Sequence, residues 1–249
     1  VVDVDDRRRW PVAAVDEGIE LRQAGLQIPV LVMVQPEESA LPALLEYHLT
    51  PLISTIKAAE TLGELARRAN RMVSIHCKVD SGMGRQGFSL NTAPADLQYL
   101  SRISHIDIEG VATHFPVADQ LDDPFTYNQI KTFKQLLKQL DKRGIPYEIA
   151  HAANSAAIMN YQGSIFNMVR PGLMTYGVWP MKTASPKNLL KPVLRWETRI
   201  TQVRELEAGA SVGYGRTYTT ESRMRAAVLP AGYADGYKHS LSNRADVLI

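Results

Sequence analysis

The sequence contains a single cysteine, Cys77, among 249 residues, which excludes a fold held by disulfide bonds and fits a cytoplasmic location. No apolar run approaches the ~20 residues that a membrane-spanning helix needs, and the first residues, VVDVDDRRRW, lack the apolar core of a signal peptide. The formal net charge is only +2 and no basic stripe is present. We therefore expect neither nucleic acid nor a membrane surface as a partner.

What is present is an ordinary globular composition, with 45% hydrophobic and 22% charged residues. The length is sufficient for one large α/β domain, or for a domain with a smaller piece. Cys77 lies inside an apolar run, so we predict that it is a small core residue. No metal site is expected.

Short apolar or β-branched runs alternate with segments of helical period up to about residue 190. The runs look continuous rather than alternating, as strands buried on both faces should. A helix is predicted from about Thr55 to Asn70, and another after Pro124, where apolar residues repeat at helical spacing until Gly144 ends it. The predicted strands are residues 11–15, 29–34, 49–54, 71–79, 106–115, 147–151 and 165–170.

Repeated strand–helix units of this length predict a parallel sheet. The count is one strand short of an eight-stranded barrel. Residues 1–5 do not supply the missing strand, because about five residues separate them from the first run and a parallel crossover needs roughly a dozen. We therefore expect an α/β fold, an incomplete TIM (β/α)8 barrel that lacks its first βα unit.

The pattern of polar and apolar residues changes near residue 190. The segment VLRWETRITQVREL alternates polar and apolar residues, as a half-buried antiparallel strand does, and Gly-rich turns follow it. The run RADVLI at the end is strand-like. We predict a partial barrel domain over residues 1–190 and the start of an all-β domain over residues 191–249.

Polar residues follow the predicted strands at the edge where barrel enzymes carry their chemistry. Lys78 and Arg85 are placed on a Gly-rich turn, KVDSGMGRQGF, which is either a solvated loop or a clamp for an anionic or electron-rich group. The others at this edge are His114, His151, Asn154, Ser155, Arg170 and Gly172.

Two of these segments are ambiguous from the residues alone. HAANSAA offers a hydroxyl and an amide at a helix start, which either bind phosphate together with the backbone N–H groups or cap the helix. VRPGLMTYG offers a Pro-Gly turn that either approaches a phosphate or is an ordinary β-turn.

The motifs as a set resemble the alanine racemase family. HCKVDSGMGRQGF, EGVATHF, HAANSAA, VRPGLMTYG, SVGYGRTY and AGYADGY stand in its order and spacing, and VAAVDEGIELRQAG near the start is also similar. The resemblance covers about residues 11 to 249. It implies pyridoxal 5′-phosphate as cofactor, a barrel followed by a β domain, a head-to-tail homodimer, and interconversion of L- and D-alanine for peptidoglycan precursors.

The resemblance also implies roles for the cations. Arg85 matches the arginine that donates to the cofactor's phenolic oxygen near the substrate carboxylate. Lys78 matches a lysine that is carbamylated in many members and then orients that arginine. Arg170 matches the arginine that faces the pyridine nitrogen of the cofactor. Because arginine keeps its proton, the pyridine nitrogen must accept a hydrogen bond and stay unprotonated.

Tyr214, in SVGYGRTY, matches the catalytic tyrosine that moves the α-proton on one face and reaches the site of the partner subunit. An unperturbed tyrosine has a pKa near ~10, so cationic neighbours must lower it, with Arg170 and His114 as candidates by family pattern. Tyr233 matches a residue that lines the path of the substrate into the site. Residues Asn154, Ser155, Gly172 and Leu173 match the phosphate cup and its surroundings.

The pattern departs from the family at one decisive place. The Schiff-base lysine of the family lies in a Lys-Ala-x-Ala-Tyr-Gly-His-Gly motif on the first barrel strand, and that motif is absent here, as is a later Cys-Met-Asp motif. We expect a fragment of a racemase truncated at both ends and inactive alone, with a non-catalytic cofactor-binding pseudoenzyme as the alternative. Serine or broad specificity is a further alternative, and a barrel decarboxylase of basic amino acids ranks below it.

Overall fold

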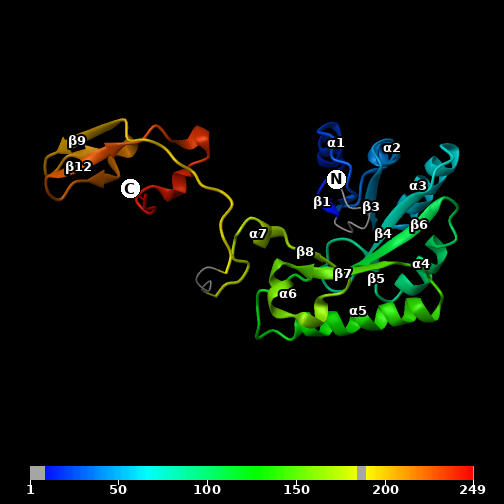
Figure 1. Ribbon diagram of the computed structural model, residues 1–249. Helices are drawn as coiled ribbons and strands as arrows, with labels where there is room; N and C mark the ends of the chain where they lie inside the picture. Colours follow the sequence, from blue (N-terminus) through cyan, green and yellow to red (C-terminus); the bar gives the residue numbers. More distant parts are fainter. Residues whose placement is uncertain (1–8, 184–188, 249) are drawn as a thin grey trace. The chain divides into compact units, whose positions relative to one another are not determined.

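The computed structural model describes residues 9–183 and 189–248, so the predicted absence of a strand at residues 1–5 lies outside the described residues. The chain divides into two compact units between Pro192 and Val193 (Figure 1). None of the helices in the described ranges combines the length and apolar character needed to cross a bilayer. Each unit is described by itself.

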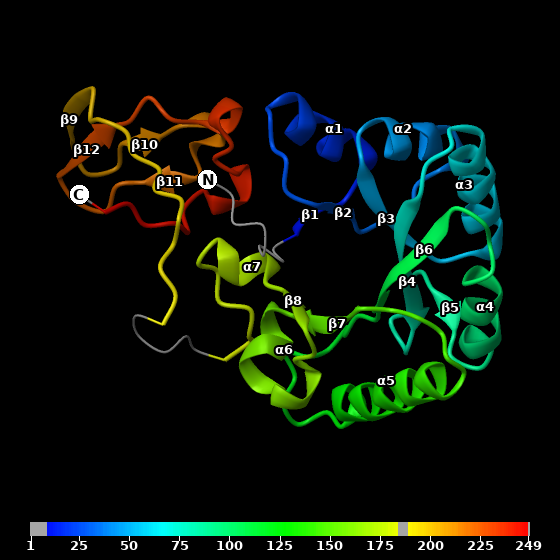
Figure 2. The ribbon, with the colours of Figure 1, turned by 45° about the vertical axis from the view of Figure 1, so that its right-hand side comes forward.

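The first unit is built on a parallel sheet whose strands follow one another in chain order. The strands curve into an arc with the helices on its outer side (Figure 2). The two edge strands, β1 and β8, are not paired with each other among the described residues, so the barrel is incomplete, as predicted. The strands in order are β1 (Trp10–Val12), β2 (Val30–Val32), β3 (Leu49–Ile53), β4 (Val73–Asp80), β6 (Ile106–Ala112), β7 (Ile149–Asn154) and β8 (Met168–Arg170).

The helices of this unit follow the predicted pattern in most places. Thr55 caps α3 by accepting the Ala58 N–H at 3.3 Å, and α5 begins directly after Pro124 and ends shortly before Gly144, whose φ is +64°. The first predicted strand is too long, since Val15 begins α1 instead. The helices are α1 (Val15–Gln23), α2 (Leu41–Glu46), α3 (Ile56–Arg68), α4 (Ala93–Leu100), α5 (Phe125–Lys142), α6 (Ser155–Asn160) and α7 (Gly172–Thr175), with short 3₁₀ turns η1 (Glu38–Ala40) and η2 (Gln162–Ser164).

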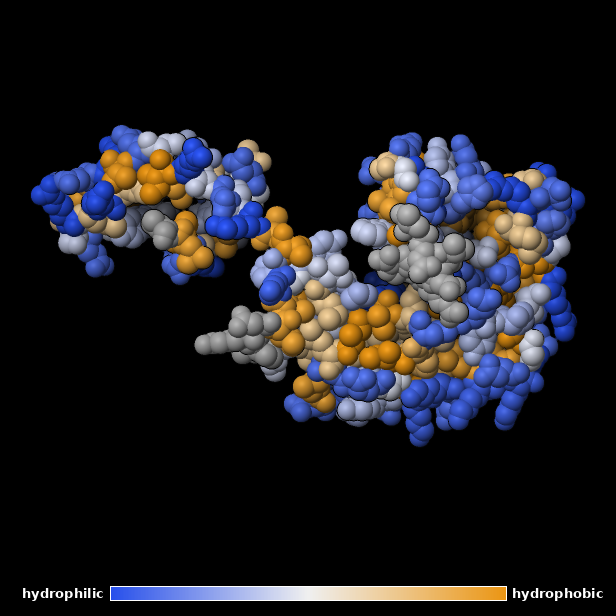
Figure 3. Space-filling model, viewed as in Figure 1, coloured by the Kyte–Doolittle hydropathy of each residue, from blue (hydrophilic) through white to orange (hydrophobic). Residues whose placement is uncertain are grey.

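The main core lies between the outer face of the sheet and the helices. Ile75, Cys77 and Val79 alternate along β4 and are completely buried, and Leu62 of α3 and Phe133 of α5 join the same cluster. The prediction that Cys77 is a core residue is confirmed. Hydrophilic residues gather on the opposite, outer side of α5 (Figure 3), as expected for an amphipathic helix.

The second unit contains two short antiparallel pairs. β9 (Gln202–Leu206) pairs with β12 (Met224–Val228), and β10 (Ser211–Val212) pairs with β11 (Tyr218–Thr219). The antiparallel prediction is confirmed, but β9 is not half-buried, because only Leu206 in it is shielded from solvent. The run RADVLI forms no strand over its described residues. The remaining elements are the 3₁₀ turns η3 (Tyr214–Arg216), η4 (Tyr233–Asp235) and η5 (His239–Leu241).

Candidate functional site

The predicted site residues of the first unit lie where its parallel strands end. Arg170 is the last residue of β8, Asn154 is the last residue of β7, and His114 follows β6 closely. Parallel strands bring their carboxyl ends to one edge, and this edge carries the polar groups. The structure therefore brings together residues that are more than fifty positions apart in the chain.

Arg170 is the centre of the cluster. Its guanidinium is buried, and Nη2 donates to the carbonyl oxygens of Thr113 at 2.7 Å and Ala152 at 2.9 Å and to His114 Nδ1 at 3.1 Å. Nη1 donates to His151 Nδ1. Burial lowers the pKa of Arg170 to about 10, so the group stays charged near neutral pH. Its Nε is buried and has no hydrogen-bond partner among the described residues.

The two histidines beside Arg170 are neutral. Burial lowers the pKa of His114 to about 3, and the charges of Arg170, Lys78 and Arg85 act in the same direction. Burial also holds the pKa of His151 well below its ordinary value. The charge of Arg170 lowers this pKa as well, more than any other nearby charge does. His151 lies inside β7, which continues to Asn154, so the strand is three residues longer at this end than predicted. Both rings can accept a hydrogen bond from the guanidinium only because they are unprotonated.

Lys78 also differs from its predicted place. It lies inside β4 with its side chain buried, not on the turn that follows. Its pKa is lowered to about 6, mainly by burial; the charges of Arg170 and Arg85 act in the same direction, and Asp80 opposes them. The amine is therefore mostly neutral near pH 7, which makes it a nucleophile rather than a cation.

The turn after β4 carries Arg85, which is exposed. Asp80 shapes this turn, because its carboxylate accepts the backbone N–H groups of Gly82 at 2.8 Å, Met83 at 2.8 Å and Gly84 at 2.9 Å. Gly87 closes the turn with φ +131°, and a Cβ there would lie 2.6 Å from the Asp80 nitrogen. The turn is thus folded back tightly against β4 rather than being a loose solvated loop.

Two further contacts hold the turn. A short strand that the sequence did not predict, β5 (Phe88–Ser89), pairs in parallel with the end of β4. Gln86 donates to the Met33 carbonyl oxygen at 2.9 Å and accepts the Gln35 backbone N–H at 3.2 Å. The segment around Arg85 is therefore fixed to the ends of β2 and β4.

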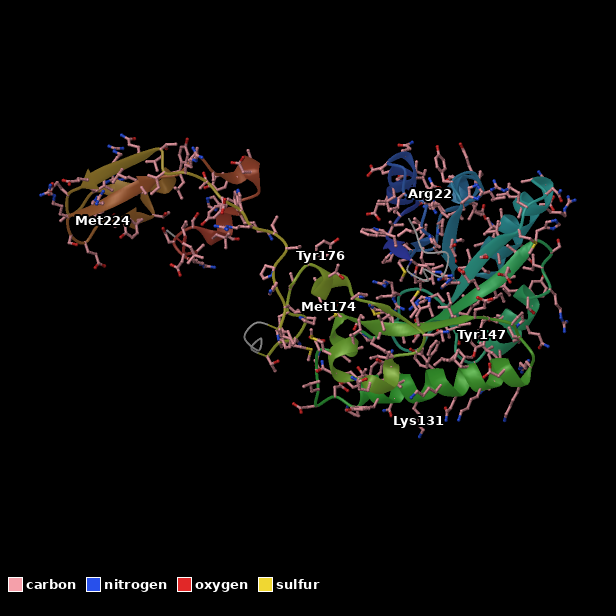
Figure 4. All side chains as sticks on the ribbon, in the orientation of Figure 1. Arg22, Lys131, Tyr147, Met174, Tyr176 and Met224 are labelled. Carbon is pink, nitrogen blue, oxygen red and sulfur yellow. The ribbon has the colours of Figure 1, made fainter. Side chains whose placement is uncertain are left out.

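Asn154 is a helix cap in this structure. Its Oδ1 accepts the Ala157 N–H at 3.1 Å and its Nδ2 donates to the Phe115 carbonyl oxygen at 3.0 Å. Ser155 Oγ accepts the backbone N–H of Met174 at 3.2 Å, which ties α6 to α7, where Met174 is labelled in Figure 4. The capping alternative for HAANSAA is thus observed, and the same contacts place α7 beside the end of β7.

The remaining predicted residues are accessible. Nothing lies within 4 Å of the position that a Cβ on Gly172 would take, and Leu173 beside it is 54% exposed. Tyr214 and Tyr233 belong to the second unit, in η3 and η4, where their side chains are 97% and 60% exposed.

Sequence reasoning missed a second buried layer beneath Arg170. His76 Nδ1 lies 2.8 Å from His151 Nε2, and His76 Nε2 lies 3.0 Å from Glu109 Oε2, while Arg9 forms an ion pair with Glu109. Burial alone would raise the pKa of Glu109, but the hydrogen bonds from His76 and Arg9 bring it to about 2. Burial lowers the pKa of His76 despite the nearby carboxylate.

Local backbone features position this layer. Ile75 pairs with Ile108 and His76 with Gly110, so Glu109 is an extra residue at a β-bulge. A Cβ on Gly110 would lie 2.5 Å from the His76 ring, so only glycine lets the imidazole pack there. The available signal was the alternation of Ser74, His76 and Lys78 with apolar residues, which places all three on one face of β4.

The arrangement suits an electron-rich ligand. The charged, buried guanidinium of Arg170 presents an N–H donor with no partner among the described residues. The nearby histidines are neutral, so Arg170 is the cation that faces a bound electron-rich group. An acceptor such as an aromatic nitrogen would satisfy Arg170 Nε, which otherwise carries the cost of an unpaired buried donor, ~1–3 kcal/mol. Gly172 and Leu173 are open to solvent on α7, which the Met174–Ser155 hydrogen bond ties to the start of α6.

Comparison with family models matches both parts of the chain. Residues 5–180 match the model described as alanine racemase, N-terminal domain, and residues 193–249 match alanine racemase, C-terminal domain.

Individual relatives agree with the models. An alanine racemase of Halothermothrix orenii is 41% identical over 242 residues, covering 97% of this chain and 64% of the relative. One of Carboxydothermus hydrogenoformans is 41% identical over 244 residues, covering 97% and 66%. The chain thus spans less than two thirds of the length of these relatives.

Solved structures show the same similarity. Alanine racemase from Clostridium difficile 630 superposes with a TM-score of 0.83 at 33% identity, covering 92% of this chain and 61% of that one. Alanine racemase from E. faecalis gives a TM-score of 0.81 at 33% identity, covering 93% and 62%.

Proposed function

Because this chain belongs to the alanine racemase family, we propose that the complete protein interconverts L- and D-alanine with pyridoxal 5′-phosphate as cofactor. The observation that carries the proposal is the buried Arg170 guanidinium with its Nε donor unpartnered among the described residues. In the same proposal, residues 1–190 form the cofactor-binding barrel domain and residues 191–249 belong to the β domain.

The residues present fit the cofactor. Arg170 Nε offers a donor to the pyridine nitrogen, and its guanidinium is held through Nη1 by His151 and through Nη2 by two backbone carbonyl oxygens. Arg85 would donate to the phenolic oxygen and lie near the substrate carboxylate, with His114 beside Arg170. Residues that would surround the phosphate are Asn154, Ser155, Gly172 and Leu173. When bound, the cofactor supplies an electron-withdrawing ring that acidifies the α-carbon of the amino acid.

Arg170 and Tyr214 would have different roles, since Arg170 would only donate a hydrogen bond and Tyr214 would transfer a proton. Arg170 keeps its own proton, since even its lowered pKa is about 10, so it donates a hydrogen bond without transferring the proton. Tyr214 would move the α-proton through its hydroxyl oxygen on one face of the substrate. Its high exposure fits a residue that serves the site of a partner subunit in a head-to-tail homodimer. Tyr233 would line the path of the substrate.

Lys78 is suited to carbamylation. Its neutral amine can attack carbon dioxide, forming an N–C bond and releasing one proton, and the product carries a carboxylate in place of the amine. Arg170 and Arg85 already act on this position electrostatically, so a negative group there is stabilised where a positive one is opposed. The carbamate would orient Arg85 for the cofactor.

The proposal places the protein in the cytoplasm, where D-alanine enters peptidoglycan precursors. The experiment is to assay the complete gene product with L-alanine and with L-serine, following the D-enantiomers by chiral chromatography. We expect racemisation of alanine that needs added pyridoxal 5′-phosphate and is lost in Tyr214→Phe while cofactor binding is kept. Cofactor-independent turnover, or full activity of Tyr214→Phe, would contradict the proposal.

A further inference from the structure

Four buried or half-buried groups form an unbranched hydrogen-bonded chain beneath the site. Arg170 Nη1 contacts His151 Nδ1, His151 Nε2 lies 2.8 Å from His76 Nδ1, and His76 Nε2 lies 3.0 Å from Glu109 Oε2. We call this set, Arg170–His151–His76–Glu109, the relay. It connects four strands, since its members come from β8, β7, β4 and β6.

The chemistry at the two ends determines the direction of every bond in the relay. The guanidinium of Arg170 can only donate, so His151 Nδ1 must accept and its proton must sit on Nε2. That N–H then donates to His76 Nδ1, which leaves the His76 proton on Nε2. The Glu109 carboxylate, whose pKa is about 2, accepts it. Both rings are neutral in this arrangement, in agreement with their lowered pKa values.

The reverse direction is excluded by the same argument. A proton on His76 Nδ1 would force His151 Nε2 to accept, and His151 would then present an N–H to the N–H of Arg170. A carboxylate at one end and a guanidinium at the other therefore fix one tautomer for each ring. Arg9 pairs with Glu109, which keeps the carboxylate ionised.

The relay fixes one side of the Arg170 guanidinium, because its last member, His151, contacts Nη1. Nη2 is fixed by the carbonyl oxygens of Thr113 and Ala152, whereas the contact of Nη1 is with His151. The rotation of the guanidinium, and with it the direction of Nε, depends on both sides.

We propose that Glu109 and His76 are positioning residues, which act through His151 to hold Arg170 so that Nε is free to bind the cofactor. This inference rests on the proposed function for the identity of the ligand, but the relay itself can be tested without any ligand. Both act on Arg170 through other residues, since His76 contacts His151 and Glu109 contacts His76.

The first measurement is nuclear magnetic resonance of the 249-residue chain labelled with ¹⁵N, in the absence of cofactor. Two-bond ¹H–¹⁵N spectra report the tautomer of each histidine, and the Arg170 Nε–H gives its own signal when it is buried. We expect neutral Nε2–H tautomers for His76 and His151 throughout about pH 5 to 8, and one sharp Arg170 signal.

The variants break the relay at different points. In His76→Phe and in Glu109→Leu we expect the Arg170 Nε–H signal to shift or split, because the contacts that hold the His151 ring against the guanidinium are broken. In Glu109→Gln the amide oxygen can still accept from His76, so the tautomers should be retained. The matched control is Asp107→Asn, which neutralises an exposed carboxylate on the same strand and should change nothing.

An unchanged Arg170 signal in a folded His76→Phe or Glu109→Leu variant would overturn the proposal. So would a Nδ1–H tautomer at either histidine of the unmodified chain. Titration of the complete gene product with pyridoxal 5′-phosphate then distinguishes the relay from the proposed function. We expect the Arg170 signal to move on binding, with at least tenfold weaker affinity in Glu109→Leu. No movement in the complete gene product would refute the proposed function, while the tautomer results would still decide the relay.

Discussion

Replacing Lys78 by methionine should stabilise the protein, because the lysine is buried where its charge is opposed. Burial and two arginines lower its pKa from 10.5 to about 6. Between these values the unfolded chain binds a proton that the folded chain does not bind, so unfolding becomes less favourable as pH rises through this window. Methionine has no proton to lose and fills a similar length.

The size of the effect follows from the same values. Removing the proton from a group with an ordinary pKa of 10.5 near pH 7 costs about 5 kcal/mol, which is the ceiling for the gain. Relaxation around the amine relieves part of this cost. We therefore expect Lys78→Met to raise the free energy of unfolding by about 2 to 3 kcal/mol near pH 7, or about 1 M in the urea midpoint.

The assay is urea unfolding followed by circular dichroism at several pH values in buffer free of carbon dioxide. The gain should shrink steadily as pH rises toward 10.5. Lys131→Met is the control, because Lys131 points away from the sheet on the outer side of α5 (Figure 4) and should show no such trend. A destabilised Lys78→Met, or a gain that does not change with pH, would refute the reasoning.

Bicarbonate provides the complementary test of the same site. Adding it should stabilise the unmodified chain and increase its mass by one carbon dioxide at Lys78, because the carbamate replaces an opposed amine with a favoured anion. Lys78→Met should respond in neither way. An equal response of both proteins would place the modification elsewhere.

Three substitutions elsewhere test the packing of the site. Gly87→Ala should lower the free energy of unfolding by about 3 kcal/mol, since its φ is +131° and the new Cβ meets the Asp80 nitrogen; urea unfolding measures this, and a neutral effect would contradict it. Gly110→Ala should cost about 2 kcal/mol by displacing the His76 ring, and a double-mutant cycle with His76→Ala should recover most of the loss; additive effects would show that the ring is not the obstacle. Glu109→Gln should cost about 2 kcal/mol above pH 4.5, and the difference should vanish as pH falls toward 2, where the carboxylate of the unmodified protein is also protonated; a constant difference in acid unfolding would refute the ion-pair account.

Much of the fold follows from local patterns. Each strand of the parallel sheet except β5 coincides with a short run of apolar and β-branched residues, and α5 follows a repeat of apolar residues between Pro124 and Gly144. These signals are local because burial on both faces of a strand, or on one face of a helix, acts on neighbouring residues. β5 escaped prediction because it is only two residues long and depends on the turn that folds it against β4.

The candidate site was predictable in part. Arg170, His114 and Asn154 stand at strand ends, which a residue pattern can indicate. The layer containing His76 and Glu109 could not be found in this way, because it depends on which residues of four different strands face one another and on a β-bulge in β6. Lys78 was misplaced for a related reason, since an amine is expected in a turn and its burial depends on surroundings that are distant in the chain.

The contact between His76 and Gly110 has a consequence for how slowly the molecule can rearrange. An imidazole packed so closely against a main chain cannot turn over while β4 and β6 stay joined, and these strands are paired from Val73–Ile106 to Lys78–Ala112. Ring rotation there must wait for the strands to separate, which happens at the rate of local unfolding rather than of side-chain motion. The ring orientation adopted when the sheet first closes is then retained for as long as the two strands stay paired.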